Sequence, residues 1–366
     1  MERNLIKKGK VRDIYQVEDD VLELVQTDRQ SAFDRHICHI PGKGKVLTEV
    51  SAHWFKEIEK RGIVKTHYIS HQGNCMRVKK CEVIPVEVVV RGIITGSTST
   101  SLWTHYQAGK RTYAGVTFPD GLVKNQILSH PVVTPTTKGE VDEPISPSEI
   151  VERGILTSDQ WNTIERIALK LFGLGSSYLS ERGLILADTK YEFGYDSDGA
   201  LCLIDEVHTC DSSRIWEASS YFSRFKYGQE PEKFDKDLIR SYLLTLCNPY
   251  GGEPLPPIPE ELIWKASRAY RDFGLRVTKT LKPKTSQLMK GLKEAATLDH
   301  GMHTYPVSSK DLLGICHRTL SSLSTHWTGE CQKQLRDKAL DDLSSTDEGT
   351  VLKAIGTLLY FCRSSD

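Results

Sequence analysis

The sequence lacks a net charge, a long apolar run and any motif of closely paired cysteines. Its 366 residues carry 48 lysines and arginines against 48 aspartates and glutamates, so the formal net charge is 0. A balanced chain produces no broad field for nucleic acid, although a local basic site stays open. No run of about 18 apolar residues is present, and residues 1–10 lack the apolar core of a secretory signal. We therefore expect no nucleic-acid partner and no membrane segment.

The cysteines do not suggest a structural framework. There are 9 of them, dispersed along the chain and never spaced as Cys-x-x-Cys. This pattern argues against disulfides and a zinc ribbon, and it favours a cytoplasmic location. His36 and His39 have a spacing that a metal could use, but no second pair of ligands lies nearby in the sequence.

Two common nucleotide-binding motifs are also missing. The segment 42–48 has the wrong spacing for G-x-x-x-x-G-K-[ST], and no G-x-G-x-x-G opens a helix. If the protein uses ATP, it does so without a Walker loop or a Rossmann turn.

The apolar pattern that is present predicts an α+β protein with a β-rich beginning. Residues 11–17 and 21–25 predict an antiparallel hairpin, and residues 86–91 predict a strand rich in β-branched side chains. Helix and strand patterns then alternate, with capped helices expected after Ser146 and Thr157.

The change in pattern along the chain suggests three parts. From about residue 296 a linker leads into two amphipathic helices. We expect an N-terminal β lobe over residues 1–115, a larger α+β lobe over 116–295 and a helical extension over 296–366.

Polar residues alternate along the predicted strand 186–194. Because successive side chains of a strand point to opposite faces, Asp188, Lys190 and Glu192 share one face. Two carboxylates on an otherwise apolar strand pair suit Mg²⁺, which usually takes one or two carboxylates plus phosphate oxygens. The alternative is a solvated face with a ladder of lysine and carboxylates.

The partner strand, around residues 201–206, adds a further carboxylate. If Ser197 and Asp198 form the centre of the turn, Lys190 lies opposite Asp205 and Glu192 lies opposite Leu203. Asp205 and Glu192 are then diagonal neighbours, within reach of a single ion.

Three segments combine cations with backbone or hydroxyl donors, as anion sites do. Lys10 and Arg12 alternate after a glycine, and Arg91 ends a strand before the glycine and hydroxyl loop 92–100. Arg214 follows Ser212 and Ser213, where the alternative is that Asp211 or Ser212 merely caps a helix. Glu87 shares the strand face of Arg91, roughly 13 Å away.

Together these segments resemble the SAICAR synthetase family, the phosphoribosylaminoimidazole-succinocarboxamide synthases. The two most diagnostic blocks are IPVEVVVRGIITGS (residues 84–97) and LADTKYEFG (186–194). The supporting blocks follow in family order between residues 5 and 295: GKVRDIY (9–15), TDRQSAFD (27–34), IPGKG (40–44), TPTTK (134–138), DE (205–206) and DSSR (211–214).

The resemblance implies a two-lobed ATP-binding fold with an antiparallel N-terminal sheet, similar in layout to protein kinases and ATP-grasp enzymes. It also implies an ATP-dependent ligase of purine biosynthesis. The carboxylate of 4-carboxy-5-aminoimidazole ribonucleotide would be joined to the amine of L-aspartate, giving SAICAR, ADP and phosphate. An acyl phosphate is the implied intermediate, since it replaces oxide by phosphate as the leaving group.

The resemblance further implies roles for individual residues. ATP would be bound by Lys10, Arg12 and Glu87, and Mg²⁺ by Glu192 and Asp205. Lys190 would neutralise developing charge, so that Lys190 and Asp205 are the implied catalytic residues. The implied substrate-binding residues are Asp34, Arg91, Ser97, Lys138, Asp211, Ser212 and Arg214. Among these, Arg91, Ser97 and Arg214 would bind the 5′-phosphate, and Lys138 the carboxylates of aspartate.

The sequence departs from the family pattern at a few positions. Val141 and Pro144 replace the usual histidine and asparagine, and His208 stands in a Val-His-Thr-Cys segment that is usually Val-Leu-Thr-Pro. Residues 296–366 lie outside the resemblance, and a homo-oligomer is left open. The rival hypotheses are a small-molecule kinase on a similar scaffold and a nucleotide-binding protein without activity.

Overall fold

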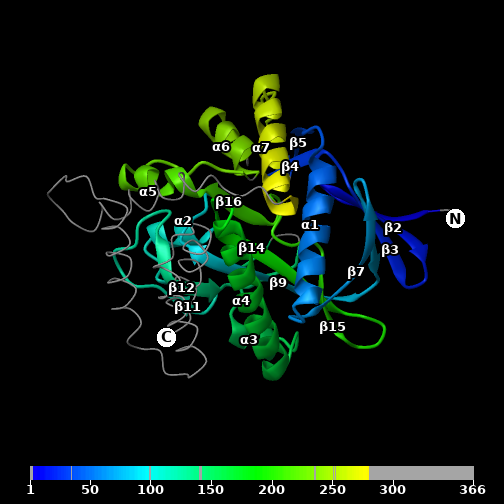
Figure 1. Cartoon of the computed structure of the whole chain (residues 1–366). Helices are drawn as coiled ribbons and strands as arrows, with labels where there is room; N and C mark the ends of the chain where they lie inside the picture. The colour runs from blue at the N-terminus through cyan, green and yellow to red at the C-terminus, as the bar shows by residue number, and fades with distance from the viewer. Residues whose placement is uncertain are drawn as a thin grey trace, which may run out of the picture.

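A computed structural model describes residues 3–33, 35–98, 100–139, 142–234, 236–249, 251 and 253–279. Asp34, Val141 and the predicted extension 296–366 therefore lie outside the described residues. The described chain forms two main β-sheets and two short strand pairs, with helices packed against the main sheets, as Figure 1 shows. This confirms the predicted α+β class. Within the described part, no helix has the length and apolarity needed to cross a membrane.

The first sheet comes from the N-terminal part of the chain and is antiparallel throughout. Its five strands run in the order β1 (Asn4–Lys8), β2 (Arg12–Glu18), β3 (Val21–Gln26), β8 (Cys75–Lys79) and β7 (Tyr68–Gln72). The predicted hairpin is β2–β3, with Arg12 opposite Gln26. A small separate pair, β4 (Arg29–Ala32) and β5 (Arg35–His39), leads into the first helix. The predicted antiparallel N-terminal sheet is thus confirmed.

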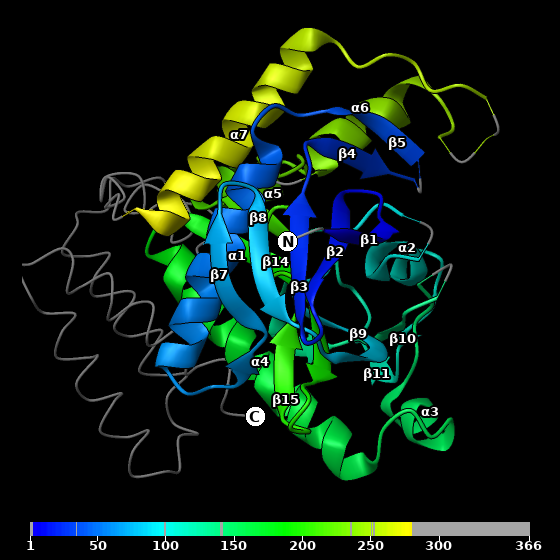
Figure 2. The ribbon, with the colours of Figure 1, turned by 90° about the vertical axis from the view of Figure 1, so that its right-hand side faces the viewer.

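The helix α1 (Lys43–Lys60) covers one side of this sheet (Figures 1 and 2). Its apolar residues recur every three or four positions, which places Leu47, Val50, Trp54 and Ile58 on one buried face. These side chains join the main core, which contains residues of both sheets.

The second sheet is built around β14 (Leu184–Tyr195). It runs β12 (Ile127–Val133), β9 (Glu82–Ile93), β14, β15 (Leu201–Ile204) and β6 (Lys65–Thr66), with β13 (Thr136–Thr137) on β9 and β16 (Ser213–Glu217) on β14. A further pair, β10 (Thr112–Tyr113) and β11 (Val116–Thr117), stands apart. Apart from β6, the strands of the first sheet end at Lys79 and those of the second sheet begin at Glu82, whereas the domain boundary near residue 115 stays a prediction.

The predicted register of the β14–β15 hairpin is wrong by one residue. Glu192 pairs with Ile204, not with Leu203. The register differs because the loop of the hairpin contains three residues, not two. The backbone amide of Asp196 donates to the carbonyl oxygen of Ala200, and Gly199 between them has φ +73°. A glycine in the left-handed region is typical of this longer hairpin loop.

The described chain contains six helices besides α1. Ser146 and Thr157 form capping boxes, as predicted, before α3 (Pro147–Glu152) and α4 (Ser158–Ser180). The other helices are α2 (Leu102–Gln107), α5 (Ala218–Lys226), α6 (Asp237–Leu246) and α7 (Glu260–Thr278). The alternative that Asp211 or Ser212 caps a helix is wrong, because residues 213–217 are the strand β16 and α5 begins only at Ala218.

A buried histidine connects α4 with the strand β14. The hydroxyl of Tyr191 lies 2.6 Å from Nε2 of His208, and the His208 ring packs edge-on against Trp54. Burial lowers the pKa of His208 to about 3, so the ring is neutral at pH 7. A Cβ at Gly175 would lie 2.4 Å from Cε1 of His208, so this imidazole requires a glycine on α4.

We therefore expect Gly175→Ala to lower the free energy of unfolding by about 1–3 kcal/mol, because the methyl group overpacks the core. Urea denaturation measures the change. In the double variant with His208→Ala the clash is removed, so the total loss should be smaller than the sum of the two single losses. Additive losses would contradict the steric explanation.

Candidate active site

A cavity of about 840 Å³ is lined by residues of both sheets, including most of the predicted site residues. Its volume is typical of small-molecule sites. The predicted residues that line it are Lys10, Arg12, Glu87, Arg91, Lys138, Lys190, Glu192, Asp205, Asp211, Ser212 and Arg214. Ser97 is exposed and is not among the lining residues, although Thr98 and Thr100 of the same loop are.

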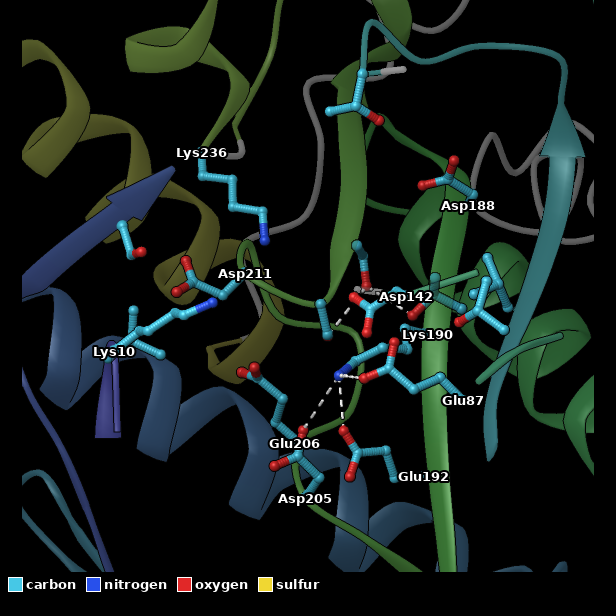
Figure 3. A pocket seen from close by; sticks show the side chains of 18 of the residues that line it. Lys10, Glu87, Asp142, Asp188, Lys190, Glu192, Asp205, Glu206, Asp211 and Lys236 are labelled. Carbon is cyan, nitrogen blue, oxygen red and sulfur yellow. Dashed lines mark hydrogen bonds and ion pairs between the residues drawn. The ribbon is translucent and has the colours of Figure 1, made fainter. Parts of the chain in front are cut away.

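Lys190 lies at the centre of one end of the cavity, as Figure 3 shows. Its Nζ donates to Oε1 of Glu87 at 2.7 Å and to Oε1 of Glu192 at 2.6 Å, and it lies 4.0 Å from Oδ2 of Asp205. Strand pairing explains the first two contacts, because Glu87 on β9 is directly opposite Glu192 on β14. Glu192 and Asp205 thus converge on the same ammonium group, that of Lys190.

Asp205 reaches this face through its backbone. The strand β15 ends at Ile204, and Asp205 has φ +69°, an unusual value for a non-glycine residue. If Asp205 simply continued the strand, its side chain would point to the face opposite that of Ile204, away from Lys190. The left-handed backbone conformation of Asp205 instead directs the side chain toward Lys190. Arg12 forms an ion pair with Asp205 and lies 3.7 Å from Oε1 of Glu206.

Charge is nearly balanced among these buried groups. Burial alone would lower the pKa of Lys190, but the charges of Glu192, Asp205 and Glu87 hold it well above its ordinary value. Burial raises the pKa of Glu87 despite its contact with Lys190. Burial also raises the pKa of Glu206, and the charge of Asp205 acts in the same direction. The ammonium group of Lys190 therefore stays charged, and the neighbouring carboxylates repel one another.

The donor set fits a magnesium ion that is also bound by phosphate. Glu192 and Asp205 supply hard carboxylate oxygens, and Lys138 forms a further ion pair with Glu192. Among the described residues, no cluster of three or more His, Cys, Asp or Glu side chains could hold a metal by itself. When Mg²⁺ binds together with a nucleotide, its coordination shell usually contains one or two carboxylates and oxygens of the phosphates.

A second group of charges lies at the other end of the β14 segment. Asp188 is directly opposite Arg91 on β9 and Arg214 on β16, so three charged residues stand side by side across the sheet. Oδ2 of Asp188 accepts from Arg91 at 3.2 Å and from Arg214 at 2.6 Å. One buried carboxylate thus fixes two guanidinium groups at the cavity wall, which suits an anion such as a phosphate.

Three further charged residues of this end were not predicted from the sequence. Lys236, Asp237 and Arg240, from the beginning of α6, line the cavity, and Asp237 accepts from both Arg214 and Arg240. Burial and the nearby Arg240 lower the pKa of Lys236. The charged residues are visible in the sequence at 236–240. They were not predicted because α6 lies far from the other motifs along the chain.

Asp211 and Ser212 also line the cavity. Oδ2 of Asp211 is 2.7 Å from Nζ of Lys43, and Ser212 hydrogen-bonds with Thr209 and Ser213. Both residues belong to the segment that joins β15 to β16.

A two-lobed α+β fold with a carboxylate-bound lysine at one end of its cavity and a pair of anchored arginines at the other defines an enzyme that acts on phosphorylated substrates. Comparison with known proteins identifies the family. A model of the SAICAR synthetase family matches residues 5–256. The chain belongs to this family.

Several relatives support the assignment. A phosphoribosylaminoimidazole-succinocarboxamide synthase of Legionella pneumophila (strain Lens) is 51% identical over 265 residues, covering 72% of this chain and 84% of the relative. A chloroplastic synthase of the same name from Vigna aconitifolia is 53% identical over 258 residues, covering 70% and 75%.

Solved structures agree with the fold. The SAICAR synthase of Saccharomyces cerevisiae, complexed with SAICAR, has a TM-score of 0.65 at 32% identity and covers 76% of this chain and 95% of its own. A SAICAR synthetase (type 2) in complex with ADP has a TM-score of 0.57 at 27% identity, covering 77% and 100%. The chain is accordingly an ATP-dependent carbon–nitrogen ligase of purine biosynthesis, which joins 4-carboxy-5-aminoimidazole ribonucleotide and L-aspartate.

The electrostatics of Asp205 give a testable pH dependence. Burial alone would raise the pKa of Asp205, but the charges of Arg12, Lys190 and Lys138 hold it well below its ordinary value. A lowered pKa in the folded state contributes stability that is complete above the unfolded pKa of about 4 and is lost as the pH falls below it.

Asp205→Asn should therefore lower the free energy of unfolding by about 1–3 kcal/mol at pH 7, and by clearly less near pH 3. Urea denaturation at both pH values measures this difference. Asp198→Asn, at the exposed tip of the same hairpin, serves as the control and should change little at either pH. A loss for Asp205→Asn that is equal at the two pH values would contradict the ion-pair explanation.

Proposed function

We propose that the chain forms its amide through an acyl phosphate made at Lys190, where Glu192 and Asp205 hold Mg²⁺. The observation that carries this proposal is the convergence of Glu192 and Asp205 on Nζ of Lys190, at 2.6 and 4.0 Å. A carboxylate is a poor acylating agent, because its leaving group would be oxide. Phosphorylation by ATP replaces that leaving group by phosphate.

The proposed reaction has two steps. A carboxylate oxygen of the ribonucleotide attacks the γ-phosphorus of ATP, the bond to the β,γ-bridging oxygen breaks, and ADP leaves. The uncharged amine of aspartate then attacks the acyl carbon, the bond to the phosphate oxygen breaks, and the amine loses a proton. Lys190 offsets the negative charge of the transferred phosphoryl group, as its raised pKa keeps it cationic.

The residues at the acidic end would bind the nucleotide. Lys10 and Arg12, next to the β2 strand, are proposed to bind the phosphates of ATP. When bound, Mg²⁺ would lower the repulsion between those phosphates and the incoming carboxylate. Glu87 contacts Lys190, so its proposed role is to hold this lysine rather than to bind ATP, the role that the family resemblance implies.

The residues at the other end would bind the ribonucleotide, whereas Lys138, which pairs with Glu192 at the acidic end, would bind aspartate. Arg91 and Arg214 are proposed to bind the 5′-phosphate, because Asp188 fixes both guanidinium groups at the cavity wall. The further proposed substrate-binding residues are Asp34, Ser97, Lys138, Asp211 and Ser212. Asp34 and Asp211 are assigned to the ribonucleotide, and Lys138 to the carboxylates of aspartate.

The proposed partners are small molecules only, and the proposed location is the cytoplasm. The balanced charge and the dispersed cysteines, none of them spaced as Cys-x-x-Cys, support this proposal. A homo-oligomer remains compatible with it.

Positional isotope exchange tests the acyl phosphate against a concerted reaction and against a kinase. With ATP labelled at the β,γ-bridging oxygen and the ribonucleotide present, label should scramble into the β-phosphate without aspartate, because the first step is reversible. Asp205→Asn should remain folded and show neither scrambling nor product. Absence of scrambling in an enzyme that makes product with aspartate would favour a concerted reaction, and a stable phosphorylated product without aspartate would favour a kinase.

Arg214→Ala should raise the Michaelis constant of the ribonucleotide by about 10–100-fold, because a charge-assisted hydrogen bond to phosphate is lost. The Michaelis constant of ATP should change little. Steady-state kinetics measure both constants, with Arg224→Ala as the control, since Arg224 pairs with Glu232 on the surface at 3.0 Å. An unchanged constant for the ribonucleotide in Arg214→Ala would refute the phosphate contact.

A further inference from the structure

The block Ile40–Gly44 is one of the segments that carry the family resemblance, but it has no role in the reaction described so far. In the structure it forms the start of α1. The backbone amides of Gly42 and Gly44 donate to the carboxylate of Asp28 at 3.0 and 2.9 Å. A Cβ at Gly44 would lie 2.5 Å from the carbonyl oxygen of Gln26, so the close approach requires glycine. This packing directs the residue between the two glycines, Lys43, into the protein.

Lys43 is completely buried and is paired with the cavity residue Asp211. Its side chain is 0% exposed, and Nζ lies 2.7 Å from Oδ2 of Asp211. The same Nζ donates to the carbonyl oxygen of Arg29 at 2.9 Å. A buried ammonium is costly unless it is paired and hydrogen-bonded, so this contact strongly restricts where Asp211 can lie.

The other oxygen of Asp211 is held from a different helix. The hydroxyl of Tyr270, on α7, donates to Oδ1 of Asp211 at 2.7 Å, and the Tyr270 side chain is fully buried. The helix α7 packs along α1 (Figure 1) and follows residue 256, where the match to the family model ends. Each oxygen of Asp211 is therefore fixed by one donor.

The carboxylate nevertheless lines the cavity, where Figure 3 places it close to Lys236. Burial alone would raise the pKa of Asp211, but the charges of Lys43 and Lys236 and the hydrogen bonds from Lys43 and Tyr270 hold it below its ordinary value. Asp211 thus faces the ribonucleotide region as an ionised acceptor of fixed orientation.

We propose that Lys43 and Tyr270 are positioning residues, which hold the Asp211 carboxylate in the orientation that the ribonucleotide needs. This inference rests on the proposed contact between Asp211 and the ribonucleotide. It makes α7 a part of the catalytic unit, because the hydroxyl of Tyr270 acts on the substrate through Asp211.

Tyr270→Phe is the sharpest test, since it removes one donor and keeps the ring that fills the core. The Michaelis constant of the ribonucleotide should rise about 3–10-fold, as expected for a single hydrogen bond. The Michaelis constant of ATP and kcat should stay within about twofold of the wild-type values. Lys43→Met is less useful, because it leaves a buried carboxylate without its cation and threatens folding.

Tyr178→Phe is the matched control. The hydroxyl of Tyr178 donates to the carbonyl oxygen of Val277 at 2.8 Å, so it also ties α7 to the rest of the protein, but it does not touch Asp211. This variant should leave the Michaelis constant of the ribonucleotide unchanged, even if it lowers the melting temperature.

A double-mutant cycle separates the inference from the proposed function. Asp211→Asn alone should raise the Michaelis constant of the ribonucleotide, and Tyr270→Phe should then add little to it. A raised constant in Asp211→Asn with an unchanged one in Tyr270→Phe would overturn only the positioning role. An unchanged constant in Asp211→Asn would overturn the substrate contact of Asp211, and the inference with it.

Discussion

The contact on which the site depends is the one between the ammonium group of Lys190 and carboxylates from three segments. Glu87 and Glu192 stand directly opposite each other on β9 and β14, a placement of like charges that is unfavourable without a cation between them. Lys190 supplies that cation at 2.7 and 2.6 Å. Because buried charges must be compensated, the positions of β9, β14 and the residue after β15 constrain one another, and the acidic end of the cavity is fixed as a unit.

The sequence predicted the composition of this unit well but its geometry only in part. The common face of Asp188, Lys190 and Glu192 follows from the alternation of a strand and is confirmed by their place at the cavity. The proximity of Glu192 and Asp205 is also confirmed, but for another reason than predicted. The register differs by one residue, and the left-handed backbone of Asp205 turns its side chain to the correct face. Gly199 was the available signal for the longer turn.

Contacts between distant segments could not be predicted from local patterns. Arg12 and Asp205 are separated by 193 residues, and nothing in either segment specifies the other. The same holds for Lys43 with Asp211, and for the position of Arg214, whose segment forms a strand because it pairs with β14. Sheet order depends on which apolar faces can be buried together, and that information is spread over the whole core rather than contained in a motif.

The order of charges along β14 also explains how an anionic substrate could be oriented. Asp188 gathers Arg91 and Arg214 at one level of the sheet, and Glu192 meets Glu87 and Lys190 four residues further on, roughly 13 Å along the strand. The substrate 4-carboxy-5-aminoimidazole ribonucleotide carries an anionic group at each end, its carboxylate and its 5′-phosphate. In the proposed binding mode its phosphate is attracted to the two arginines, whereas the carboxylates at the acidic end repel any anion that Lys190 and a divalent ion do not neutralise. The reversed orientation would place the more highly charged phosphate among those carboxylates, so in the proposed binding mode the sheet would select which end of the substrate meets ATP.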